Sequence, residues 1–255
     1  MHPWIRVAAL AACMTVGLPA AHGAAPSASE EAYEQYLSGL GYQDLGQWPQ
    51  AVAAYTKAIQ LDPDYADAYY ARGLASAHAG DVAAAQADWT AAIALQPEMW
   101  KAYLNRGRTF LQQGAPDVAE ADFTKALTLA PSAEAYLERG TARWKRHDPD
   151  GALADFAKGI ALSPYLGDGY GRRGRVLLAL DRLDEAAADF TKQITLREGV
   201  PGAHLGLGHI RERQGRLTEA AEHYTVAVVL EPATQTYLLR AGVFEQLDDV
   251  QRAMA

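Results

Sequence analysis

The sequence predicts an all-α protein, a solenoid of antiparallel helix-turn-helix hairpins, on two observations. The first is a proline that recurs every 33 or 34 residues, at Pro63, Pro97, Pro131, Pro164 and Pro232, with Glu198 in the one missing place. The second is that each interval holds two stretches of helical hydrophobic periodicity separated by a turn signal. A hairpin of this size cannot bury its apolar face alone, so neighbouring hairpins must stack.

The N-terminal segment differs from everything that follows it. Arg6 precedes an apolar run at residues 7–16, and Ala21 and Gly23 have the small-residue spacing of a signal peptidase site. This pattern predicts a cleaved export signal at 1–23, a linker at 24–31 and a periplasmic or secreted protein; the alternative is an N-terminal helix. The run is too short to span a membrane, and no other stretch approaches the required length.

Cys13 ends a Leu-Ala-Ala-Cys sequence that is typical of a lipidation site. Only six residues separate it from Arg6, which is short for the apolar part of such a signal. We therefore expect no lipid anchor, although lipidation of Cys13 remains the alternative. Because Cys13 is the one cysteine of the chain, cleavage after Gly23 would leave no thiol for a disulfide or a metal.

The repeats divide residues 32–233 into six hairpins that start near 32, 66, 100, 133, 167 and 201. The third is representative: Tyr103, Gly107 and Phe110 share one helical face before Gly114 breaks the helix. Pro116 then opens a second helix, where a missing N–H does no harm, and Pro131 ends it.

Small residues recur where the two helices of each hairpin should meet. A glycine stands at the centre of every first helix, although it costs about 1 kcal/mol relative to alanine; these are Gly39, Gly73, Gly107, Gly140, Gly174 and Gly208. Alanines match them from the second helices, at Ala51, Ala85, Ala119, Ala152, Ala186 and Ala220, and an aromatic ring follows each alanine, at Tyr55, Trp89, Phe123, Phe156, Phe190 and Tyr224. We expect close helix contact at the glycines, with the rings filling the seam.

This combination of glycine, alanine, aromatic and terminal proline resembles the tetratricopeptide repeat over about residues 32–232. It is most similar to the subset with Arg-Gly in the first helix, in an exported bacterial form. The resemblance implies a right-handed superhelix with a concave groove lined by first helices. Gln193 and Glu198 depart from the pattern, in places usually held by alanine and proline.

An internal comparison predicts an ion pair inside each of four hairpins. Hairpins two to five carry an arginine before the helix glycine and an aspartate before the aromatic residue, whereas hairpins one and six lack both. The expected pairs are Arg72 with Asp88, Arg106 with Asp122, Arg139 with Asp155, and Arg173 with Asp189. We interpret them as structural.

The sequence gives little sign of catalysis. A net charge of −8 argues against binding to nucleic acid, which needs a positive field. The Gly-x-Gly-x-x-Gly match at 169–174 lacks the strand that a dinucleotide site requires. His204, His209 and His223 do not have the spacing of a metal pair on one helix. We expect no cofactor, metal or enzyme activity.

We expect the groove that the resemblance implies to be the binding site of this protein. Its partner would be another protein that binds through an acidic or extended segment. The candidate binding residues are Lys101, Asn105, Arg108, Trp144, Lys145, Arg172, Arg175, His209 and Arg213. We expect a non-catalytic scaffold or adaptor of the bacterial cell envelope. The alternative function is an accessory subunit or a receptor for a small molecule or glycan. The alternative interpretation of the candidate groove residues is that they form a mixed, solvated surface that binds nothing.

The C-terminal segment 234–255 reads as a partial seventh repeat or a capping helix. Tyr237, Arg240 and Phe244 restart the first-helix pattern, and Ala253 reaches the small-residue position of a second helix. We expect Leu239, Val243 and Leu247 to have little cover. A partner, further sequence or a second copy would then cover this end; a frayed cap is the alternative.

Overall fold

A computed structural model describes residues 27–254 of the chain, and this part contains thirteen α-helices and no β-strand. The helices are α1 Ala28–Asp44, α2 Trp48–Leu61, α3 Ala66–His78, α4 Val82–Leu95, α5 Trp100–Gln112, α6 Pro116–Leu129, α7 Ala133–Lys145, α8 Pro149–Leu162, α9 Gly167–Ala179, α10 Leu183–Leu196, α11 Pro201–Arg213, α12 Leu217–Leu230 and α13 Thr234–Met254.

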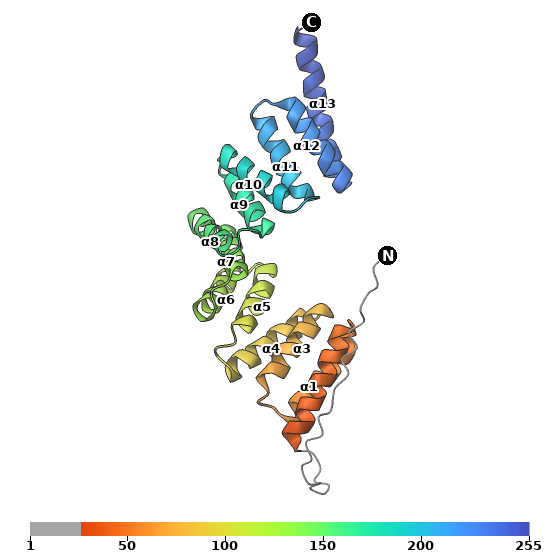
Figure 1. The fold of residues 1–255 in the computed structure, drawn as a ribbon, viewed down its shortest axis with the longest axis vertical. Coiled ribbons are helices and arrows are strands. Elements are labelled where there is room, and N and C mark those ends of the chain that lie inside the picture. The colour runs from red at the N-terminus through yellow and green to blue at the C-terminus, as the bar shows by residue number, and fades with distance from the viewer. Residues whose placement is uncertain (1–26, 255) are drawn as a thin grey trace, which may run out of the picture.

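Consecutive helices from α1 to α12 pair as six hairpins, which follow one another along an arc (Figure 1). Each second helix also packs on the first helix of the next hairpin. First helices touch across hairpins as well, α5 with α7, α7 with α9 and α9 with α11. They therefore lie on the inner side of the arc, and we call the surface they form the concave face. The predicted all-α solenoid of hairpins is confirmed.

The turn inside every hairpin depends on one residue with a positive φ angle. Four hairpins use glycine there, with φ between 68° and 90°, at Gly46, Gly80, Gly114 and Gly215. The other two use His147 at 62° and Asp181 at 60°. Glycine adopts this conformation without a steric penalty, whereas a residue with a Cβ atom does so at a cost.

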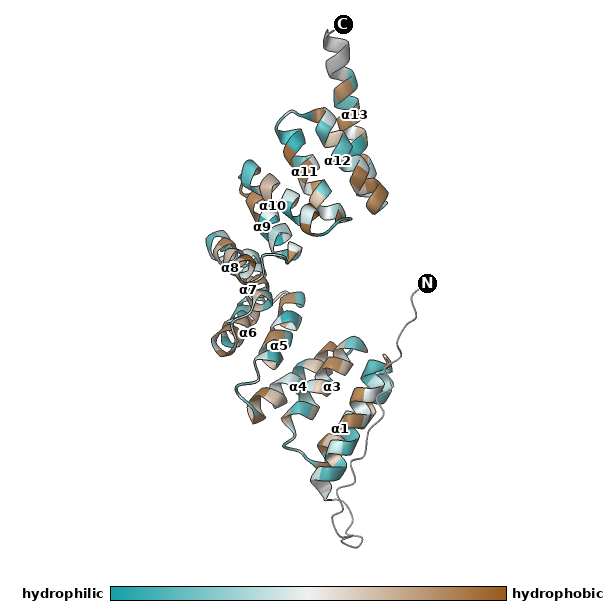
Figure 2. Cartoon of the chain, in the orientation of Figure 1, coloured by the Kyte–Doolittle hydropathy of each residue, from teal (hydrophilic) through white to brown (hydrophobic). Residues whose placement is uncertain are grey.

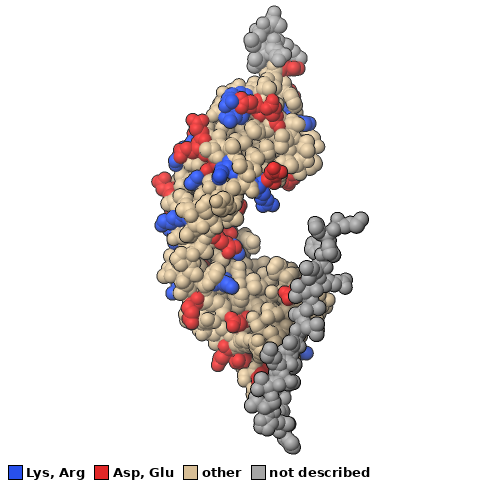
Figure 3. Space-filling view, in the orientation of Figure 1, with Lys and Arg blue, Asp and Glu red and all other residues tan. Residues whose placement is uncertain are grey.

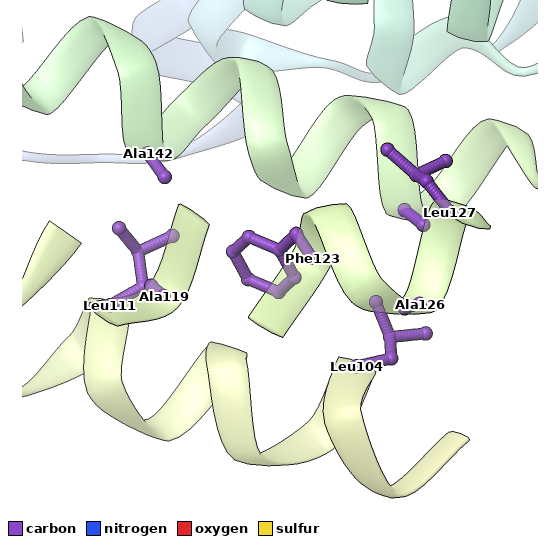
Figure 4. Close-up of a cluster of buried hydrophobic side chains, with 8 residues drawn as sticks. Leu104, Leu111, Ala119, Phe123, Ala126, Leu127 and Ala142 are labelled. Carbon is purple, nitrogen blue, oxygen red and sulfur yellow. The ribbon is translucent and has the colours of Figure 1, made fainter. Parts of the chain in front are cut away.

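The seam of each hairpin is built as its small residues predict. A Cβ atom on Gly107 would lie 2.7 Å from the Phe123 ring, so only glycine fits at this crossing. Phe123 is fully buried, with Leu111 and Ala119 on one side of the ring and Leu104, Ala126 and Leu127 on the other (Figure 4).

The first helix begins at Ala28 and not near residue 32, so α1 takes up half of the predicted linker. The reason is a capping box: the Ser27 hydroxyl accepts from the Glu30 backbone N–H, and the Glu30 carboxylate accepts from Ser27 N. The predicted signal segment and Cys13 lie outside the described residues. Within 27–254, no helix is both long and apolar enough to cross a membrane.

The C-terminal segment has the form of a single capping helix, one of the two alternatives, whereas the prediction that its apolar residues have little cover is wrong. Residues 234–254 form a single helix without a turn, because no glycine follows Phe244 to break it. Val243 is completely buried, and Leu239 and Leu247 pack beside it on Tyr224 of α12. Other apolar side chains remain exposed instead, among them Leu238 at 62% and Phe244 at 51%. Hydrophobic residues are accordingly visible on the first turns of α13 at the edge of the stack (Figure 2).

Candidate functional site

The four predicted arginine–aspartate pairs are confirmed. In each, the arginine Nε and one terminal nitrogen donate to the two carboxylate oxygens at 2.7–2.9 Å. The arginines also lie over a tyrosine of their own helix, 5.6–5.9 Å from the ring centre. Hydrogen bonds to the aspartates raise the pKa of all four arginines. Because the aspartates are buried between the helices, these pairs stabilise the hairpins and leave no charge for a ligand.

Three of these arginines also bind the preceding hairpin, which the sequence analysis missed. Arg72 donates to the Thr56 hydroxyl, Arg106 to Thr90 and Arg139 to Thr124, at 3.1–3.3 Å. Arg173 has Ala157 in the equivalent place, and a surface cavity of about 370 Å³ lies beside both residues. The threonines could have been found from the sequence, because each directly follows the aromatic seam residue of its hairpin (Tyr55, Trp89 and Phe123).

The candidate binding residues all lie on first helices, as expected. Lys101, Asn105 and Arg108 are on α5, Trp144 and Lys145 on α7, Arg172 and Arg175 on α9, and His209 and Arg213 on α11. Charges of both signs border the hollowed side of the molecule (Figure 3).

A polar network on the concave face connects four hairpins through three of these residues. Asn105 donates to the Tyr70 hydroxyl at 3.1 Å, and Arg108 donates to Asn105 at 3.4 Å. Arg108 also pairs with Glu134 and, at 3.4 Å, with Glu138. Glu138 in turn pairs with Arg172 at 3.3 Å. The network compensates the charge of both arginines within the protein.

Arg172 has further partners that hold it in this network. Its Nε donates to Asp168 at 2.7 Å, and one terminal nitrogen donates to the Thr141 hydroxyl at 2.9 Å. Burial alone would lower the pKa of Arg172, but the carboxylates of Glu138 and Asp168 raise it above its ordinary value. Arg172 is therefore a positioned internal cation.

The remaining candidates divide into paired and unpaired side chains. Arg213 pairs with Asp181 at 3.1 Å, and His209 contacts the Tyr224 hydroxyl at 3.1 Å. Arg175 is exposed and forms no hydrogen bond or ion pair among the described residues. Lys101 and Lys145 are exposed on neighbouring first helices, and Trp144 is 36% exposed. The structure thus leaves Lys101, Lys145, Arg175 and Trp144 accessible to a ligand.

A pocket of about 250 Å³ opens between α3 and α5, next to the network. Nine residues line it: Leu74, Ala77, His78, Val82, Trp89, Asn105, Arg108, Thr109 and Gln112. Asn105 and Arg108 were candidates from the sequence, whereas Trp89 was interpreted as a seam residue. Its indole nitrogen is buried and has no hydrogen-bond partner among residues 27–254.

The residues singled out for other chemistry have structural surroundings. Gly169, Gly171 and Gly174 are buried within α9, not in a loop before a helix. His204 and His223 approach each other, with 3.3 Å between their Nδ1 atoms. Within 27–254, no three His, Cys, Asp or Glu side chains lie close enough together to hold a metal ion.

Stacked helical hairpins with accessible polar side chains on a concave face define a class of protein, the α-solenoid binding modules. Models described as TPR repeat and tetratricopeptide repeat match most of this chain, the first at residues 39–80 and the second at 79–134, 116–167, 137–194 and 166–236. The chain belongs to the tetratricopeptide repeat family. Members of this family generally mediate protein–protein interactions.

Solved structures share the fold. PilW, described as a widely conserved type IV pilus biogenesis factor, has a TM-score of 0.72 at 20% identity, over 80% of this chain and 96% of PilW. YrrB, described as having an unusual peptide-binding site, has a TM-score of 0.60 at 22% identity, over 72% and 96%. The APC/C hetero-tetramer Cut9–Hcn1 has a TM-score of 0.70 at 17% identity; the match spans 84% of this chain but only 43% of the other. No curated protein matches the chain.

Proposed function

We propose that this protein is a non-catalytic scaffold of the bacterial cell envelope that binds an extended segment of a partner protein along its concave face. The observation that carries the proposal is the set of unpaired side chains on adjacent first helices, Lys101, Lys145, Arg175 and Trp144. Cations without an internal carboxylate partner attract an acidic segment, whereas Arg108 and Arg172 are already compensated by Glu134, Glu138 and Asp168. The Arg-Gly form of the repeat and the N-terminal signal pattern support an exported bacterial protein.

A charge-reversal experiment tests the binding face. The variant Lys101→Glu/Lys145→Glu/Arg175→Glu should lose capture of partner protein from envelope extract, and capture by the unmodified protein should weaken with salt. The matched control reverses three exposed lysines on second helices, Lys57, Lys125 and Lys192, with the same change in net charge. Equal capture by both variants would overturn the proposal for the concave face.

Export is tested separately. We expect mass spectrometry of the protein from a periplasmic fraction to show a chain that begins at or near Ala24, with residues 1–23 removed. Membrane retention that disappears on Cys13→Ser would instead establish a lipid anchor.

A further inference from the structure

Helix α13 repeats the face that the first helix of a hairpin turns toward its own second helix. In α5 this face has an aromatic residue, an arginine, a small residue and a second aromatic residue, namely Tyr103, Arg106, Gly107 and Phe110. In α13 the same residue types form what we call the outer face, namely Tyr237, Arg240, Ala241 and Phe244. Tyr103 and Phe110 pack against a core cluster that includes Phe123 of α6, whereas Tyr237 and Phe244 are 45% and 51% exposed. The outer face is therefore one half of a seam.

Arg240 is positioned like the arginines that form the four ion pairs. Its guanidinium lies 5.5 Å from the centre of the Tyr237 ring, close to the 5.6–5.9 Å in the other four hairpins. Each of those four arginines binds an aspartate on the second helix of its hairpin. Arg240 forms no ion pair with any residue of 27–254. Charge complementarity therefore favours an acidic side chain opposite Arg240.

The cavity beside Phe244 lacks a wall that a second helix provides elsewhere. Cavities of about 510 and 370 Å³ in hairpins two and five are lined by the preceding second helix, by the first helix and by the second helix of the hairpin itself. Ala84 and Ala87 of α4, and Ala188 of α10, belong to this last wall. The cavity of about 390 Å³ at the C-terminal end is lined by α12 and α13 alone. A helix packed on the outer face of α13 would complete it.

Ala241 restricts the size of the side chain that can lie over it. At the equivalent Gly107, an added Cβ atom would lie 2.7 Å from Cε1 of the Phe123 ring. The Cβ atom of Ala241 therefore leaves no room for a phenylalanine in the same position. A leucine side chain ends at its Cδ atoms and avoids this closest contact.

A second copy of this chain fits the outer face poorly. Contacts across a two-fold axis are reciprocal, and Arg240 lies near the middle of the segment 237–244. Symmetric pairing of two α13 helices would bring two Arg240 side chains together, and repulsion between like charges opposes such a contact.

We propose that the outer face of α13 binds an amphipathic helix of a partner protein, in which an aspartate is followed directly by a leucine-sized apolar residue. The aspartate accepts hydrogen bonds from Arg240, and the apolar residue lies over Ala241. The helix also closes the cavity beside Phe244. This surface is separate from the concave face, so the inference goes beyond the proposed function and does not depend on it.

The probe is a peptide based on α6, the second helix that packs on the matching face of α5. It spans residues 115–131 with Phe123→Leu, and a lactam bridge from Ala121→Glu to Lys125, both exposed in α6, keeps it helical. Fluorescence anisotropy should show that it binds the 255-residue protein roughly ten- to hundredfold tighter than the same peptide with Asp122→Asn, the range for a hydrogen bond to a charged group. Absence of binding, or equal binding of the two peptides, would refute the proposal.

Variants of the protein locate the bound peptide. Arg240→Met should abolish the preference for the aspartate peptide, whereas Arg197→Met, which removes an exposed arginine elsewhere, should keep it. The unmodified protein should bind the leucine peptide tighter than its Phe123 form, and Ala241→Gly should reduce or reverse this difference because the ring then has room. Circular dichroism confirms that each variant is folded. A preference for aspartate that survives Arg240→Met, or tighter binding of the Phe123 form to the unmodified protein, would contradict the proposal.

The proposal for α13 and the proposed function can fail independently. The variant Lys101→Glu/Lys145→Glu/Arg175→Glu should bind the peptide as well as the unmodified protein does. If this variant loses the peptide and Arg240→Met keeps it, the peptide occupies the concave face and the proposal for α13 is wrong. If the triple variant still captures the envelope partner but Arg240→Met loses the peptide, the proposed function is wrong and the α13 surface stands. Sedimentation that shows a dimer from which the peptide is excluded would make a second copy the occupant and would also refute the proposal.

Discussion

Among the single residues, Asp155 has the most demanding environment. Its side chain is 1% exposed and receives hydrogen bonds from Arg139 at 2.8 Å on both oxygens, with Arg143 at 3.0 Å as a second ion-pair partner. A buried carboxylate of this kind is tolerated only because its partners are in place. The same aspartate in hairpin five, Asp189, faces the more exposed Arg173, whose side chain is 28% accessible.

We predict that Asp155→Ala lowers the free energy of unfolding of hairpin four by ~3–5 kcal/mol, because it leaves Arg139 largely buried without its partner. Local opening measured by native-state hydrogen exchange would check this value. Asp189→Ala should cost less, since water reaches Arg173. In the double variant Arg139→Met/Asp155→Leu, much of the stability should return; a loss equal to that of the single variant would argue against the pair.

The turn residue His147 offers a second test at this scale. It adopts φ 62°, in a place where four other hairpins have glycine. His147→Gly should therefore raise the melting temperature, by the equivalent of about 1 kcal/mol, because a left-handed conformation is costly with a Cβ atom. Gly114→Ala should lower it by a similar amount, and thermal denaturation followed by circular dichroism measures both. Opposite signs for the two changes are the decisive result.

At the scale of the element, hairpin six is the one that replaces the ion pair with histidines. Compared with hairpins two to five, His204 replaces tyrosine, Leu207 replaces arginine and His223 replaces aspartate. Burial lowers the pKa of both histidines, and His204 lowers that of His223 further through like charge. Arg211 acts in the same direction on His223, whereas Glu219 and Glu222 oppose it.

These pKa shifts predict that hairpin six loses stability in acid. The folded histidines have a pKa below the unfolded value of ~6.5, so the unfolded hairpin binds more protons and acid favours it. The contribution is fully present above pH ~6.5 and is lost as the pH falls below this value. Hydrogen exchange in α11 and α12, corrected for the intrinsic pH dependence, should show easier opening at pH 5 than at pH 7.

Hairpin three and one variant are the controls for this effect. Hairpin three has Tyr103, Arg106 and Asp122 in the same places and should open equally at both pH values. His204→Tyr/Leu207→Arg/His223→Asp gives hairpin six the same three residues and should abolish the difference. An acid effect that survives in this variant would contradict the assignment to the histidine pair.

For the whole molecule, the C-terminal end shows how the solenoid is closed. Helix α13 covers Ala220, Ala221 and Tyr224 of α12 with its buried side chain Val243. Its other side exposes Phe244, next to a largely apolar cavity of about 390 Å³ that Val226 and Leu247 also line. One side of α13 is therefore a cap, and the other remains an apolar surface.

Removal of α13 should destabilise the last hairpin. Truncation after Ala233 exposes Tyr224 and the alanines beside it, so we expect a lower melting temperature and increased exchange in α12. Truncation after Asp248 keeps the contacts of Val243 and should have little effect. In the full chain, residues 236–247 should be protected at every protein concentration; protection that rises with concentration would indicate self-association through this end.

The sequence alone determined the seam and the repeated ion pair within a hairpin, both of which depend on register. The glycine, alanine and aromatic positions predicted each seam, and the joint presence or absence of arginine and aspartate predicted four ion pairs, because side chains at equivalent positions of two helices meet in every copy of the hairpin. The paired change in hairpin five follows the same rule: Gln193 extends into the space left by Gly171, where hairpins three and four have leucine.

Charge compensation between hairpins was decided only by the tertiary structure. Whether Arg108 and Arg172 are free or neutralised depends on the curvature that brings Glu138 of α7 to both, and sequence spacing does not specify a curvature. The unpaired indole nitrogen of Trp89 also depends on the tertiary structure. An aromatic residue in the sequence identifies a seam position, but the sequence does not show whether a hydrogen-bond acceptor lies near its polar atom; none does among the described residues. Local periodicity therefore sets the repeat, whereas the packing of one repeat on the next sets which of its side chains are left to bind.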